Sequence, residues 1–99
     1  MPITEKGYAL STRSEDSLLE FPCDFPIKAM GEASFGFDAL VVGLVREHAP
    51  DLHEGAVSVR ESSGGKYLSV TVNIRATSKQ QLDQIYMSLS GHERILMVL

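Results

Sequence analysis

Apolar and polar side chains alternate in several segments of the chain, and the clearest of these segments runs from Tyr67 to Ala76. Every second residue of that segment is apolar, which predicts a strand with one buried face. Shorter alternations predict strands over 25–31 and 56–61 and a last strand over 94–99. Ser62-Ser63-Gly64-Gly65-Lys66 separates the second and third of these strands, and consecutive glycines are typical of a hairpin turn.

A period close to that of a helix appears in two other segments. Over 37–48 it produces one continuous apolar stripe, made of Phe37, Leu40, Val41, Leu44, Val45 and His48. Thr77 and Ser78 each have a glutamine three residues later, which predicts a capping box at the start of the second helix. The buried stripe of that helix is expected to consist of Leu82, Ile85, Tyr86 and Leu89, and Gly91 is expected to end it.

The predicted elements follow the order β-α-β-β-α-β. This order indicates an α+β, ferredoxin-like sandwich, in which a four-stranded antiparallel sheet has two helices on one face. The first and third strands are expected in the centre, and the second and fourth at the edges. We assign residues 18–99 to this single domain and residues 1–17, which lack an apolar period, to a disordered polar leader.

Charge and composition exclude several classes of function. Nine Lys and Arg against 13 Asp and Glu give a net charge of −4, and no basic cluster is present, which argues against nucleic acid or a membrane surface as partner. No apolar run reaches the ~20 residues that span a bilayer. The single cysteine, Cys23, excludes an internal disulfide, and we expect a cytoplasmic protein.

The residues that most often carry chemistry form no catalytic or metal-binding pattern. His48 and His53 are separated by Pro50 and do not share a helix face, and His92 follows the predicted helix end. Cys23 has a carboxylate neighbour, which does not activate a thiol. We therefore predict no catalytic residues, no metal site and no cofactor.

One loop is the best candidate for a small-ligand site. The segment between the first strand and the first helix provides Gly31, Glu32, Ala33, Ser34 and Gly36. Helix N-termini attract anions, and small residues allow a ligand to approach the backbone. A plain flexible loop is the alternative interpretation.

The last predicted strand provides a candidate interface. We expect Ile95, Met97 and Leu99 to face the core, so that Leu96 and Val98 face outward. Together with Met30 of the neighbouring first strand, Leu96 and Val98 would form an apolar patch beside an unpaired sheet edge, which favours strand addition or face-to-face pairing. The alternative is that residues 18–21 cover this patch.

Five short motifs together resemble one family of small bacterial proteins. They are Leu18-Leu19-Glu20-Phe21-Pro22, Lys28-x-Met30-Gly31, His48-Ala49-Pro50, Gly65-Lys66-Tyr67 followed by Ser69-Val70-Thr71, and Met97-Val98-Leu99. In this order and spacing they resemble the YbeD-like, or UPF0250, family over residues 18–99. The resemblance implies the same β-α-β-β-α-β fold, related in shape to ACT regulatory domains, and it implies no catalytic residues.

The sequence therefore leads to two hypotheses about function. The first is a small non-enzymatic regulatory or interaction module that acts through a protein partner or as a homodimer, by its open sheet face or edge strand. The alternative is an ACT-like sensor that binds an amino acid or a carboxylic acid at the 31–36 loop.

Overall fold

The structure is a computed structural model of the chain, and it describes residues 20–99. The leader predicted for residues 1–17 lies outside the described residues. The elements are β1 (Cys23–Glu32), α1 (Phe37–Arg46), the short 3-10 helix η2 (Glu54–Ala56), β2 (Val57–Glu61), β3 (Tyr67–Ala76), α2 (Lys79–Ser90) and β4 (Met97–Val98). This order confirms the predicted β-α-β-β-α-β arrangement.

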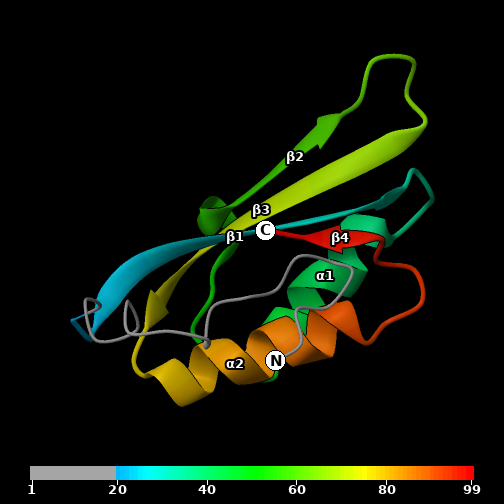
Figure 1. The fold of residues 1–99 in the computed structure, drawn as a ribbon. Helices are drawn as coiled ribbons and strands as arrows, with labels where there is room; N and C mark the ends of the chain where they lie inside the picture. Colours follow the sequence, from blue (N-terminus) through cyan, green and yellow to red (C-terminus); the bar gives the residue numbers. More distant parts are fainter. Residues whose placement is uncertain (1–19) are drawn as a thin grey trace.

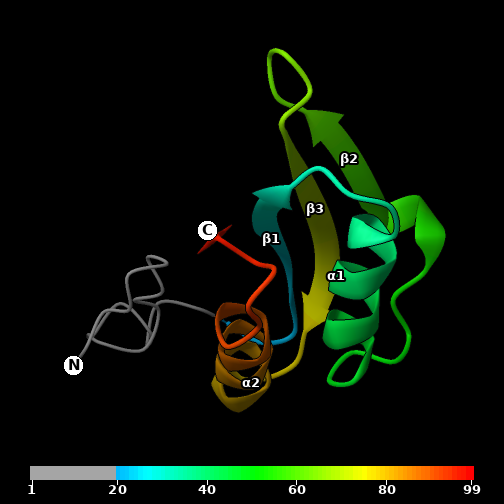
Figure 2. The ribbon, with the colours of Figure 1, turned by 90° about the vertical axis from the view of Figure 1, so that its right-hand side faces the viewer.

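One four-stranded antiparallel sheet, with the strand order β2-β3-β1-β4, forms the framework. Both helices lie on the same side of this sheet (Figure 1), and Figure 2 shows β1, β3 and β2 side by side. We call the side without helices the open face. The central and edge positions of the strands are those that the sequence predicted.

The core lies between the sheet and the two helices. Strict alternation places Ile27 and Ala29 of β1 and every second residue of β3 from Val70 to Ala76 on the helix side, where all are buried. The largest fully buried side chains are Phe37, Ile27, Leu82, Ile85, Leu89 and Ile95. The predicted stripe of α2 is buried throughout, whereas Leu40, Leu44 and His48 of the predicted first stripe are half-buried.

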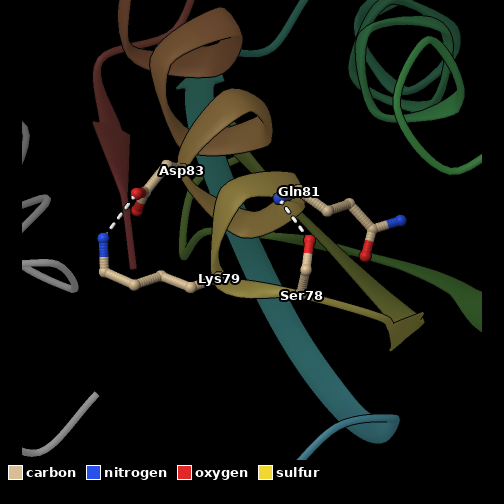
Figure 3. Close-up of polar contacts among 4 residues, drawn as sticks. All are labelled: Ser78, Lys79, Gln81 and Asp83. Carbon is tan, nitrogen blue, oxygen red and sulfur yellow. Dashed lines mark hydrogen bonds and ion pairs between the residues drawn. The ribbon is translucent and has the colours of Figure 1, made fainter. Parts of the chain in front are cut away.

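Polar contacts fix the start of α2. The Ser78 hydroxyl caps the helix by accepting a hydrogen bond from the backbone N–H of Gln81 at 3.0 Å, and Lys79 pairs with Asp83 at 2.8 Å (Figure 3). The Gln81 side chain accepts a hydrogen bond from the backbone N–H of Thr77 at 2.7 Å and donates one to the His48 carbonyl at 2.8 Å. Gln81 therefore completes the predicted cap and also joins the two helices.

The C-terminal segment differs from the prediction. The last strand contains only Met97 and Val98, because the preceding residues form a turn in which the Ile95 N–H donates to the His92 carbonyl at 3.1 Å. Ile95 and Val98 are both buried, three residues apart, while Leu96, Met97 and Leu99 are exposed. The predicted alternation over 94–99 is therefore wrong, and Val98 faces the core instead of the open face.

Two glycines with contrasting surroundings offer a test of the packing. A methyl group at Gly31 would stand 2.5 Å from the backbone oxygen of Arg94 and 2.5 Å from Cε1 of Phe37, whereas one at Gly43 would meet nothing within 4 Å. Gly31→Ala should lower the free energy of unfolding by about 1–3 kcal/mol, because buried neighbours must shift. Gly43→Ala, in the middle of α1, should raise it by about 0.5–1 kcal/mol. Urea denaturation of both variants checks the pair; a Gly31→Ala protein as stable as its parent would contradict this packing.

Candidate functional site

Exposed apolar side chains gather around β4, at one edge of the sheet. Leu96, Met97 and Leu99 are consecutive in the chain except for the buried Val98, and each is at least 42 % exposed. Met97 lies opposite Met30 of β1 in the ladder, and Met30 is half-buried. We call Met30, Leu96, Met97 and Leu99 the edge patch. Of the predicted interface residues, the edge patch contains Met30 and Leu96 but not Val98, which is buried. Met97 and Leu99, which were expected in the core, are part of the patch instead.

Backbone and side-chain hydrogen bonds hold the edge patch against β1. The Leu99 N–H donates to the Lys28 carbonyl at 2.8 Å, the Lys28 N–H donates back at 3.0 Å, and the Leu96 N–H donates to the Met30 carbonyl at 2.8 Å. From the helix side, the Tyr86 hydroxyl donates to the Leu99 carbonyl at 3.3 Å. The patch is therefore displayed on an ordered strand and not on a loose tail.

Burial changes the chemistry of Tyr86. Tyr86 as a residue is only 6 % exposed, and desolvation by burial raises the pKa of its phenol from 10.0 to about 12. Tyr86 therefore keeps its proton, and so its hydrogen bond to Leu99, throughout the neutral range.

The loop between β1 and α1, predicted as a ligand site, lies next to the start of β4. Gly31 and Glu32, predicted as part of this loop, belong to the end of β1 instead. Gly31 is buried between the Arg94 backbone and the Phe37 ring, so it serves packing. Glu32, Ala33 and Ser34 are exposed and Gly36 is half-buried with a φ of 82°. Thus the predicted residues are contiguous at the surface, apart from Gly31.

Arg94 brings a positive charge to this loop, which the sequence analysis missed. Its Nη2 donates to the Ser34 hydroxyl at 2.6 Å, and its guanidinium lies 6.0 Å from the centre of the Phe37 ring. The predicted strand order could have indicated that Arg94 lies near this loop. A last strand that runs antiparallel to the first must begin where the first strand ends, and Arg94 lies at that beginning. Phe35, in the same loop, is fully exposed.

His48 and Cys23 take part in packing between elements of the fold. His48 Nε2 lies 3.0 Å from the Ser88 hydroxyl, which links α1 to α2. Cys23 is a half-buried free thiol packed against the core. Within residues 20–99, no group of three or more His, Cys, Asp or Glu side chains is placed to hold a metal ion, and no helix there is long and apolar enough to cross a membrane.

Comparison with known proteins identifies the family. The model of a family described as a protein of unknown function (DUF493) matches residues 16–99. The chain belongs to this family. A UPF0250 protein of Chromobacterium violaceum is 53 % identical over 85 residues, which cover 86 % of this chain and 96 % of the relative. A UPF0250 protein of Nitrosomonas europaea is 46 % identical and covers 87 % of this chain and 99 % of its own length. The resemblance seen in the sequence motifs is therefore confirmed.

Two solved structures have the same fold. Protein HP0495 from H. pylori matches with a TM-score of 0.66 at 13 % identity, over 100 % of this chain and 94 % of the other. The ACT domain of GTP pyrophosphokinase from Chlorobium tepidum matches with a TM-score of 0.59 at 15 % identity, over 77 % of this chain and 84 % of the other. These similarities establish an ACT-like, ferredoxin-like fold for this DUF493 member.

The raised pKa of Tyr86 predicts a loss of stability in alkali. The folded protein keeps the phenol protonated up to about pH 12, whereas the unfolded chain releases this proton near pH 10. The free energy of unfolding should therefore fall as the pH rises through this interval. In Tyr86→Phe this part of the decline should disappear, whereas Tyr67→Phe, which leaves Tyr86 in place, should retain it. Urea denaturation at a series of pH values measures the difference, and an unchanged decline in Tyr86→Phe would refute the assignment.

Proposed function

We propose that this DUF493 protein is a non-catalytic regulatory or interaction module that works by associating with a protein through the edge patch. The occupant we favour is a second copy of the chain. A strictly heterologous protein partner is the other outcome of the tests below.

The exposure of apolar side chains on a well-ordered edge strand carries this proposal. Leu96, Met97 and Leu99 are three of the six large hydrophobic side chains exposed among residues 20–99, and they lie within four positions of the chain. Apolar surface concentrated in this way is typical of an interaction site. An edge strand also offers unpaired backbone N–H and C=O groups to a further strand.

The chemistry of the edge patch favours self-association. Residues 95–99 carry no charged side chain, so two copies would meet apolar side chains with apolar side chains. A twofold pairing of one edge strand with its own copy uses the same patch twice, which is the usual geometry of homodimers. It would extend the four-stranded sheet into a continuous sheet across both copies.

A double substitution tests this proposal. Leu96→Lys combined with Met97→Glu places charges on two exposed side chains, so the fold should persist while the association is lost. Sedimentation velocity over micromolar to millimolar concentrations should show a dimer for the parent and a monomer for the variant. Circular dichroism checks that the variant remains folded.

Met87→Lys is the matched control, because Met87 is an exposed apolar side chain on α2 that is not part of the edge patch. It should associate as the parent does. A parent that stays monomeric over this range and captures no partner through β4 would overturn the proposal, and so would a double variant that still associates.

The surroundings of Ser34 favour a second candidate function, a small-ligand sensor at the β1–α1 loop. The Arg94 guanidinium stands 2.6 Å from the Ser34 hydroxyl, beside the start of α1, where backbone N–H groups face outward. A cation next to a helix N-terminus suits a carboxylate, as found in an amino acid or a carboxylic acid.

An NMR titration tests the sensor. Glycine, other small amino acids and short carboxylic acids, each at millimolar concentration, should shift the amides of Glu32, Ala33 and Phe37. Arg94→Gln should weaken any such binding about tenfold, the loss expected for a charge-assisted hydrogen bond. Arg46→Gln, on the far end of α1, should leave it unchanged. Absent shifts would remove this class of ligand.

A further inference from the structure

Two cationic side chains on the open face lack the partners that the other cations have. Elsewhere, Arg46 donates to the Leu52 carbonyl, Arg75 and Lys79 pair with Asp24 and Asp83, and Lys66 and Arg94 lie over the rings of Tyr67 and Phe37. Lys28 and Arg60 are the remaining Lys and Arg within residues 20–99. Neither has a hydrogen bond, an ion pair or a ring contact for its side chain in that range.

The sheet register brings these two cations to one place. Lys28 of β1 lies opposite Thr71 of β3, which in turn lies opposite Ser58 of β2. Arg60 of β2 lies opposite Ser69 of β3, one position further along this face. Three strands thus place two cations and three hydroxyls on adjacent rows of the open face.

These side chains line a shallow hollow of about 360 Å³, which we call the cationic hollow. Its lining consists of Lys28, Ser58, Val59, Arg60, Ser69 and Thr71, and it contains no carboxylate. The three hydroxyls have no side-chain hydrogen bond within the described part of the chain. In a protein with a net charge of −4, a place with two cations, three free donors and no acid is suited to an anion.

A second hollow, of about 220 Å³, adjoins the first and shares Lys28, Arg60 and Ser69 with it. Its other lining is largely apolar, with Met30, Tyr67, Leu68 and Leu99, and we call it the apolar hollow. Glu61 lies at this second hollow and not at the first. The carboxylate of Glu61 therefore repels an anionic group from the apolar hollow and favours its placement in the cationic one.

We propose that the open face binds a small organic phosphate, with the phosphate in the cationic hollow and an apolar substituent in the apolar hollow. Two cations match the two charges of a phosphate monoester, and the hydroxyls of Ser58, Ser69 and Thr71 supply donors for its oxygens. The apolar substituent would remove the surfaces of Met30 and Tyr67 from water. This site lies apart from the β1–α1 loop and does not depend on the proposed sensor.

Phenyl phosphate serves as the probe, because it joins a phosphate to an apolar ring. Titration of the full-length protein, followed by NMR, should shift the amides of Ser58, Ser69 and Thr71 together with that of Tyr67. Inorganic phosphate, which lacks the ring, and phenol, which lacks the charge, should each bind more weakly. Benzoate should also bind more weakly, because it carries a single charge.

Substitutions of the two cations provide the decisive comparison. Lys28→Gln and Arg60→Gln should each weaken phenyl phosphate binding about tenfold, and the double variant should weaken it further. Both side chains are exposed, so the variants should melt as the parent does. Arg75→Gln removes a cation from the same face but outside both hollows, and it should bind phenyl phosphate as the parent does.

Three results would overturn this inference. Binding that survives in the Lys28→Gln, Arg60→Gln double variant would show that the anion sits elsewhere. Equal loss in Arg75→Gln would mean that only the general charge of the face matters. Benzoate binding as tightly as phenyl phosphate would exclude a phosphate-selective site.

Discussion

The antiparallel pairing of β1 with β3 is the constraint on which the rest of this structure depends. The two strands pair over ten residues, from Cys23 opposite Ala76 to Glu32 opposite Tyr67. Because side chains alternate across a strand, this one register decides which residues face the helices and which face outward. A shift of β1 by one position would place Lys28 opposite the buried Val72 and so turn it toward the core. The burial of the alternate residues from Val70 to Ala76 fixes the register against such a shift.

The end of the β1–β3 ladder also organises the sheet edge. At Gly31 the chain is packed so closely against the Phe37 ring and the Arg94 backbone that no side chain fits. This contact brings together the end of β1, the start of α1 and the turn before β4. The position of the edge patch and the approach of Arg94 to Ser34 both follow from it. The β1–α1 loop and the β4 edge are therefore neighbours, although they are some 60 residues apart in the chain.

The open face is divided into regions of different chemistry. Near β4 it is apolar, with Met30, Met97 and Leu99, and toward β2 it is cationic and rich in hydroxyls. At the far end of the ladder, Arg75 is neutralised by Asp24 at 3.1 Å. An association at the edge and an anion on the face would thus use separate surfaces that meet at Leu99 and Met30. A ligand in the apolar hollow would touch the same side chains that form the edge patch, which would link the two kinds of binding physically.

The sequence by itself determined the element order, the bounds of β3, the buried stripe of α2 and its cap to within one residue, Thr77 or Ser78, because each depends on periodicity or on neighbours within a few residues. It also predicted the loop that follows β1, although it placed Gly31 and Glu32 in that loop and the structure has them in the strand. It failed in the last six residues, where a turn at His92–Ile95 replaces strand geometry and shifts Val98 into the core. The contact of Arg94 with Ser34 and the shared hollow of Lys28 and Arg60 both join distant segments of the chain. Only the tertiary structure decided them, because strand register and close packing at Gly31 bring such residues together, and no local pattern encodes that.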